Sequence, residues 1–480
     1  MHDKRWLALY VLCAGVLMIV LDTTIVNVAL PSIREDLHFT ETSLVWVVNA
    51  YMLTFGGCLL LGGRLGDLYG HRRLFLLGIT VFTLASLACG LASSQALLVG
   101  ARAMQGVGGA VVSAIALSLI MNLFTEPADR AKAMGIYGFV CAGGGSLGVL
   151  LGGLLTSALN WHWVFLVNLP IGGAVYAFCR VLLPQGRGDA SSGRLDVAGA
   201  VTVTAALMLA VYAIVNGNEA GWSGATTLGL LATATVLMAL FLVVEVRATA
   251  PLMPLGLFRL RNLATANVVG VLWAAAMFAW FFISALYMQL VLGYSALQIG
   301  LAFLPANLIM AAFSLGLSAR IVMRFGIRLP LSAGLLLAAA GLSLFAFAPV
   351  EGSFLVHVLP GMLLLGLGCG MALNPVLLAA MSEVAPSESG LASGIVNTAF
   401  MMGGALGLAV LASIAAARTG TLLAIGLDSR LALTGGYHIA FAAGAVFALM
   451  AALLGTLLLR AGAQVAGTVG AAAAAPARDS

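Results

Sequence analysis

The chain has 480 residues, of which 62% are hydrophobic and only 8% are charged. A soluble domain carries about 25% charged residues, so this composition cannot cover the surface of a water-soluble globule of this length. The net charge of +5 is spread over short loops instead of one face, which excludes a nucleic-acid binder. We therefore expect an all-α membrane protein that has the lipid bilayer, and no nucleic acid, as its partner.

Fourteen apolar runs follow one another along the chain. A spanning helix needs about 20 apolar residues, and backbone groups in hydrocarbon must be hydrogen-bonded within their own element, so each run is predicted to be a helix. The predicted spans cover residues 6–31, 43–63, 74–94, 97–121, 133–157, 161–179, 197–216, 225–244, 264–292, 298–319, 329–348, 355–381, 391–417 and 437–459.

The distribution of Lys and Arg orients these spans, because positive residues accumulate on the cytoplasmic side. With the N-terminus inside, eighteen Lys and Arg residues fall in cytoplasmic segments, and only Arg34, Arg418 and Arg430 fall outside. We therefore predict a multi-pass protein of the bacterial inner membrane with both termini in the cytoplasm.

An internal repeat divides the chain. The loop after the second span carries Arg, Gly and Arg at offsets that recur after the tenth span: Arg64, Gly70 and Arg72 match Arg320, Gly326 and Arg328. Many transporters build a central site between two such halves. The predicted organisation is a six-helix bundle over 1–183, a linker with two extra helices over 184–250, a second six-helix bundle over 251–462 and a disordered cytoplasmic tail over 463–480.

Five short motifs stand in order at particular helices. They are Leu21 to Pro31, Gly63 to Arg73, Arg102 to Gly108, Trp161 to Gly172, and Gly390 to Gly394 with Asn397. On these motifs the sequence resembles the major facilitator superfamily and, within it, the fourteen-spanner drug:proton antiporters of the multidrug and quaternary-ammonium resistance type. The resemblance implies the major facilitator fold, two six-helix bundles plus two additional central transmembrane helices, and proton-coupled export of amphipathic organic compounds by alternating access.

The fifth span departs from that family's pattern. Gly145 and Val149 stand where its antiport motif has prolines. This departure supports an alternative, a facilitator that carries one metabolite or a natural product made by its own cell and that is not a proton antiporter. A third class, a membrane enzyme or receptor, lacks any soluble domain or catalytic cluster, so we expect no enzymatic activity.

Two charged residues lie well inside predicted spans. A charge at such depth costs roughly 2.5–3.5 kcal/mol on insertion scales, so it must face a cavity or a partner. Asp22 can carry a proton between the two sides, or it can serve helix packing by accepting hydrogen bonds. Arg102 stays charged and cannot cycle protons; the resemblance implies a role in proton transfer, and the alternative is a structural anchor.

The loop between the second and third spans contains the candidate gating residues Gly63, Asp67, Gly70, Arg72 and Arg73. A carboxylate here can cap a facing helix and pair with Arg, which would hold one conformation closed. The resemblance supports this role for Asp67, and the alternative is an ordinary solvated loop charge.

Small residues recur on one face of the fifth span. Gly144, Gly148 and Gly152 are four residues apart, a spacing that permits close helix packing. In the twelfth span, Asn374 and Pro375 are expected to break the helix near a cavity.

Aromatic residues concentrate in the ninth span and could bind organic cations or contact lipid. The candidate substrate-binding residues are Asn27, Trp273, Trp280, Tyr287, Asn374, Asn397 and Met401. The scattered Cys and His residues predict neither a metal site nor a disulfide framework. No P-loop pattern is present, which excludes ATP as the driving ligand within this chain. We expect a monomer without cofactors whose ligands are a small-molecule substrate and protons.

Overall fold

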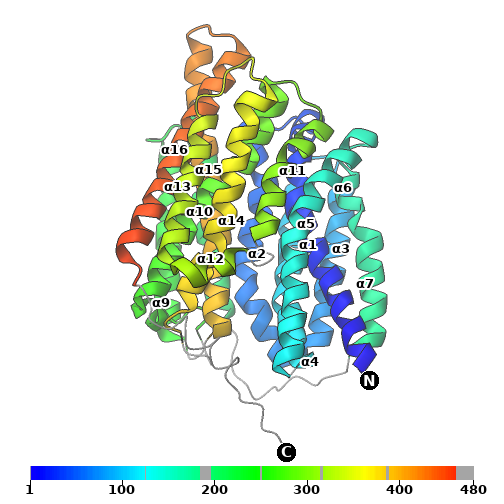
Figure 1. Ribbon diagram of the computed structural model, residues 1–480. Helices are drawn as coiled ribbons and strands as arrows, with labels where there is room; N and C mark the ends of the chain where they lie inside the picture. Colours follow the sequence, from blue (N-terminus) through cyan, green and yellow to red (C-terminus); the bar gives the residue numbers. More distant parts are fainter. Residues whose placement is uncertain are drawn as a thin grey trace, which may run out of the picture.

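The computed structural model describes residues 2–124, 126–183, 196–248, 251–313, 317–384 and 389–460, and over these ranges it contains helices and no strand. Figure 1 shows the helices side by side in one elongated bundle. The helix α1 begins, and α16 ends, toward the same end of this bundle. The expected tail over 463–480 lies outside the described residues.

The first half of the chain supplies α1 to α7. Their bounds are α1 His2–Asp36, α2 Glu41–Tyr69, α3 His71–Gly90, α4 Gln95–Leu123, α5 Pro127–Ala158, α6 Trp163–Leu166 and α7 Asn168–Leu182. Local chemistry sets the ends: Thr40 and Ser43 form a capping box at the start of α2, and Gly70 ends it with a φ of 93° that favours glycine.

The rest of the chain supplies α8 to α16. They are α8 Val197–Ala220, α9 Ala225–Arg247, η1 Leu255–Arg259, α10 Arg261–Leu286, η2 Tyr287–Val291, α11 Ala296–Ala312, α12 Ser318–Phe325, α13 Arg328–Phe345, η4 Phe354–Val358, α14 Leu359–Met381, α15 Ser389–Ala424 and α16 Ser429–Leu458.

The helices are long and apolar enough for a multi-pass membrane protein. Within the described residues, 12 helical segments reach the length and hydropathy of a membrane span, and two shorter apolar stretches, Leu147–Ala158 in α5 and Ala296–Ala312 in α11, accompany them. Each of the fourteen predicted spans thus overlaps helical segments among the described residues, which confirms the predicted fold class.

The predicted break in the twelfth span is wrong. The helix α14 runs through Pro375 without interruption, as α1 runs through Pro31 and α11 through Pro305. In a packed membrane bundle, local adjustment and neighbouring helices satisfy the carbonyl group that proline leaves without a donor, and Pro375 is buried in such packing.

Packing follows the two halves. The helix α4 packs against α2 and α3, and α1 against α5, while α10 packs against α15 and α16 and α13 against α14. The most extensive contacts between the halves are α2 against α15 and α5 against α11, and α1 also contacts α10 and α11. The linker helices α8 and α9 pack on each other, and α8 also contacts α2 and α15. The linker pair therefore lies beside one of the two junctions between the halves.

Candidate functional site

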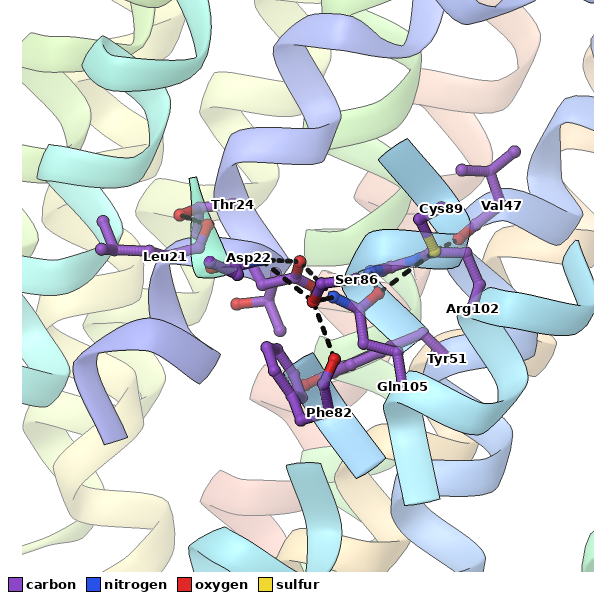
Figure 2. Close-up of polar contacts among 12 residues, drawn as sticks. Leu21, Asp22, Thr24, Val47, Tyr51, Phe82, Ser86, Cys89, Arg102 and Gln105 are labelled. Atoms are coloured by element: carbon purple, nitrogen blue, oxygen red, sulfur yellow. Dashed lines mark hydrogen bonds and ion pairs between the residues drawn. The ribbon is translucent and has the colours of Figure 1, made fainter. Parts of the chain in front are cut away.

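A buried ion pair joins α1 to α4. Arg102 Nη1 lies 2.5 Å from Asp22 Oδ2, and the two side chains are 1% and 0% exposed. Gln105, one turn after Arg102, donates from Nε2 to Asp22 Oδ1 at 2.6 Å, and its Oε1 accepts from Arg102 Nη1 at 2.7 Å. Three side chains thus form a closed ring of charge-assisted hydrogen bonds, shown in Figure 2.

Two further helices complete the network. Asn168 at the start of α7 donates to Asp22 Oδ1 at 3.0 Å, and Ser86 of α3 accepts from Gln105 Nε2 at 2.8 Å. The Cys89 thiol lies 3.7 Å from Gln105 Oε1. All these groups are buried, so the Asp22 carboxylate is solvated by protein donors in place of water.

Arg102 is held on its other sides by backbone and aromatic groups. Its Nε donates to the carbonyl oxygen of Val47 at 2.9 Å. Its guanidinium carbon lies 4.4 Å from the ring centroid of Tyr51 and 5.7 Å from that of Phe165. A buried ion pair repays its desolvation only with such additional partners, and removing the carboxylate would leave the guanidinium charge uncompensated.

Glycines of α5 set the position of Asp22 along the bundle. A Cβ on Gly148 would lie 2.0 Å from Thr24 Oγ1 and 2.9 Å from the Leu21 carbonyl oxygen, and one on Gly152 would lie 2.7 Å from the Ile25 carbonyl oxygen. The predicted close contact of Gly144, Gly148 and Gly152 is therefore made with the turns of α1 that carry the carboxylate.

A cavity of about 680 Å³ adjoins the network between the two halves. It is lined by the middle of α1, by the middle and later turns of α2, by the later turns of α4, by Tyr137 in the first half of α5, and by the first turns of α15. It therefore lies toward the end of the bundle where α1 begins. At the opposite end α5 and α11 are in contact, and the Leu297 backbone N–H donates to Ser157 Oγ at 3.0 Å.

The lining of the cavity is apolar with scattered hydroxyl and amide groups. Thr23, Ser113, Ser118 and Ser393 are among its small polar side chains, and none of the described lining residues is charged. Asp22, Arg102 and Gln105 do not line it. Such a surface suits an apolar molecule that carries a few hydrogen-bonding groups.

The structure brings two of the predicted substrate-binding residues to this cavity, Asn397 and Met401. The other five do not line it. Trp273, Trp280 and Tyr287 are buried in the core of the second half, and the Tyr287 hydroxyl donates to the Pro349 carbonyl oxygen at 2.7 Å.

Asn27 and Asn374 also lie apart from the cavity lining. Asn27 donates to the carbonyl oxygen of Thr23 on its own helix at 3.2 Å. Asn374 is half-buried in α14, directly before Pro375.

The predicted gating residues lie where α2 ends and α3 begins. Gly63 lines the cavity, Gly70 forms the turn, and Arg72 donates from Nη2 to the carbonyl oxygen of Arg180 at the end of α7. Arg73 is exposed. The side chain of Asp67 lies outside the described part of the chain, so its role stays a prediction.

Sequence reasoning did not single out Gln105, Ser86, Asn168 or Tyr51. Gln105 and Asn168 stand inside two of the motifs, from Arg102 to Gly108 and from Trp161 to Gly172, so a polar residue within a motif was an available signal. Ser86 and Tyr51 stand in ordinary apolar helices, where nothing local distinguishes them.

A bundle of this topology, with a buried ion pair beside a cavity between two halves, defines a polytopic membrane transport protein. The Major Facilitator Superfamily profile matches residues 12–408. The chain belongs to this superfamily.

Relatives of established name are similar over nearly the whole chain. It is 40% identical to a puromycin resistance protein of Streptomyces alboniger, over 99% of this chain and 95% of that one. It is 39% identical to a cephamycin export protein of Amycolatopsis lactamdurans, over 94% and 92%. It is 35% identical to a tetracenomycin C resistance and export protein of Streptomyces glaucescens, over 88% and 78%.

Solved structures agree on the fold. A bacterial homologue of the human lysosomal transporter Spinster, solved in an inward-facing and unoccupied conformation, has a TM-score of 0.67 at 17% identity, over 95% of this chain and 97% of that one. A bacterial homologue of the human drug and peptide transporters PepT1 and PepT2 has a TM-score of 0.62 at 14% identity, over 94% and 97%.

Proposed function

We propose that this protein exports amphipathic organic compounds in exchange for protons, by alternating access, as a monomer in the bacterial inner membrane with both termini in the cytoplasm. The names of its relatives describe resistance to puromycin, export of cephamycin, and resistance to and export of tetracenomycin C. The observation that carries the proton half of the proposal is the Asp22–Arg102 pair, in which one protonatable carboxylate is sealed from water.

The chemistry follows from the ring of hydrogen bonds. Guanidinium remains charged, so the group in the pair that can take up a proton is Asp22. A proton on Asp22 removes the negative charge that compensates Arg102. Arg102 keeps its bonds to Gln105 Oε1 and the Val47 carbonyl oxygen, but its charge-assisted bond to Asp22 becomes a weaker bond to a neutral acceptor. The ionised and protonated forms then favour different helix arrangements, and this difference in free energy is what couples proton binding to a conformational change.

The substrate class is inferred from the cavity. With no charged side chain among the described residues of its lining, the cavity selects by shape, apolar area and hydrogen bonding. Neutral and weakly basic antibiotics therefore fit it at least as well as permanent cations.

A second candidate is export of one natural product made by the same cell. The names of two relatives, the cephamycin and the tetracenomycin C export proteins, each specify a single compound, which favours this candidate. Gly145 and Val149 stand in place of the family's prolines, which favours a mechanism without proton exchange. Both functions use the same cavity, and they differ in substrate range and in proton coupling.

Proteoliposomes with an imposed pH gradient test the proposal, with puromycin as the transported compound and proton flux recorded in parallel. Asp22→Asn keeps an oxygen acceptor for Arg102 but cannot ionise. We expect uphill accumulation to fall at least about tenfold, with downhill movement partly kept, because coupling requires two protonation states. The matched control is Glu35→Gln on the exposed end of the same helix, which should transport like wild type.

Wild-type accumulation with matching proton flux in Asp22→Asn would refute proton exchange through Asp22. Transport of a broad panel of antibiotics would favour the first candidate, and transport of a single compound without proton flux would favour the second.

A further inference from the structure

Tyr51 stands between the cavity and the buried ion pair. It is one of the residues that line the cavity, and its ring also covers the guanidinium of Arg102 with 4.4 Å between the guanidinium carbon and the ring centroid. The pair has no exposed surface of its own beyond 1% of the Arg102 side chain. A proton that enters from the cavity therefore meets the Tyr51 ring before it meets the pair.

The other sides of the pair are closed by groups that the network already uses. Phe165 lies on Arg102 at 5.7 Å, and Asn168 and Ser86 bind the Asp22–Gln105 side at 3.0 Å and 2.8 Å. None of these three residues lines the cavity. Tyr51 is thus the cavity-facing member of the shell around Arg102.

The Tyr51 side chain is held by its ring and not by its hydroxyl. The hydroxyl is buried and has no hydrogen-bond partner, and a Cβ on Gly109 would lie 3.0 Å from it. The ring stacks on Phe55 with centroids 5.6 Å apart. An unpaired buried hydroxyl and a lost cation–π contact carry penalties of the same order. If the ring moves away from Arg102 and its hydroxyl reaches water or substrate in the cavity, the protein loses the cation–π contact and the hydroxyl gains a hydrogen-bond partner. The free energies of these two changes are comparable, so they largely offset each other.

We propose that the Tyr51 side chain controls access to the buried ion pair. In this structure its ring separates the Asp22–Arg102 pair from the cavity, and movement of the ring into the cavity admits water and protons to Asp22. Tyr51 is then a positioning residue, since it acts on the proton through access to Asp22. The proposal rests on Asp22 as the proton carrier, but the shielding itself can be tested without transport.

The test measures access to Asp22 in the purified protein. A water-soluble carbodiimide with glycinamide converts water-accessible carboxyl groups to amides, and mass spectrometry of the peptide that contains Asp22 gives the rate. Exposed Asp36 on the same helix serves as the internal standard, and buried Glu245 must stay unlabelled in every variant as a check that the fold is intact.

We expect slow labelling of Asp22 in wild type and a rate about tenfold or more higher in Tyr51→Ala. Loss of the cation–π contact between Tyr51 and Arg102 shifts the equilibrium between shielded and accessible Asp22 by that order. Tyr51→Phe retains the ring and should label like wild type. Leu117→Ala is the matched control, because it enlarges the same cavity without removing the ring that covers Arg102 or Phe55, on which that ring stacks, and it should also label like wild type.

Equal rates in wild type and Tyr51→Ala would overturn the proposal. So would fast labelling of Tyr51→Phe, since the ring would then not be the barrier, or of Leu117→Ala, since any widening of the cavity would then suffice. The labelling result does not depend on the transport of Asp22→Asn in proteoliposomes. Failure of the proposed role of Tyr51 can therefore be distinguished from failure of proton exchange.

Discussion

Asn49 of α2 donates a hydrogen bond of 2.9 Å to the backbone carbonyl oxygen of Ala405 in α15, with both residues buried. The bond joins the two halves of the transporter at a junction that also contains small and apolar groups, such as Gly56 against Met402. A single neutral hydrogen bond contributes about 1 kcal/mol, so this junction can hold one arrangement and still release it.

Asn49→Leu should therefore shift the conformational equilibrium more than the stability. Losing about 1 kcal/mol between the halves changes the ratio of arrangements roughly fivefold, while removal of the unpaired Asn49 Oδ1 offsets part of the cost. Spin labels at exposed Leu91 and Phe347, at the ends of α3 and α13, would report a larger separated population. Asn216→Leu removes a bond within one helix and should leave the distances unchanged.

Gly148→Ala should damage the α1–α5 contact that positions Asp22. The new Cβ would meet Thr24 Oγ1 at 2.0 Å, which can rotate, and the Leu21 carbonyl oxygen at 2.9 Å, which cannot. Overpacking of this kind costs about 1–3 kcal/mol, so a lower melting temperature and slower transport are expected. Gly145→Ala, whose Cβ finds only Thr24 Cγ2 at 3.9 Å, should be tolerated; equal behaviour of the two variants would contradict the packing argument.

Alternating access requires the contact between Ser157 and Leu297 to open. A double variant with Ser157→Cys and Leu297→Cys should form a disulfide, because the Leu297 N–H lies 3.0 Å from Ser157 Oγ. Oxidation should stop transport, and a reductant should restore it. Either single cysteine variant should be insensitive to oxidation, and full transport by the oxidised double variant would show that this end does not move.

Glu245 of α9 faces Asp196 at the start of α8. A Cβ on Gly199 would lie 2.6 Å from Asp196 Oδ2 and 2.9 Å from Glu245 Oε1, and neither oxygen has a hydrogen-bond donor. Glu245→Gln supplies an amide donor and keeps an acceptor for the Met253 N–H, so it should raise stability by about 1 kcal/mol. Glu245→Ala loses that acceptor and should lower it. The melting temperatures of the two variants and the wild type are compared by thermal unfolding. A Glu245→Gln variant that is less stable than wild type would contradict the close approach of Glu245 Oε1 and Asp196 Oδ2.

Topology is tested by reporter fusions. The eighteen-to-three distribution of positive residues predicts that fusions after Glu351 or Gly426 report the periplasm and that a fusion after Phe258 reports the cytoplasm. A cytoplasmic signal at Glu351 would invert the predicted orientation of the second half.

The sequence by itself determined the class of fold, the positions of the apolar helices and two residues of the candidate site. Hydrocarbon forces every span to be a helix about 20 residues long, so local hydropathy suffices to find the helices. The cost of charge in the membrane singles out Asp22 and Arg102 in the same way.

Only the tertiary structure decided which groups meet. Asp22 and Gln105 are 83 residues apart and Asp22 and Asn168 are 146 residues apart, and no local pattern encodes those contacts. The same is true of Trp273 and Trp280, whose aromatic character suggested a binding surface but which pack in the core of the second half. Apolar side chains suit lipid, core and cavity equally, so the way the helices pack, and not the identity of the residue, selects among the three.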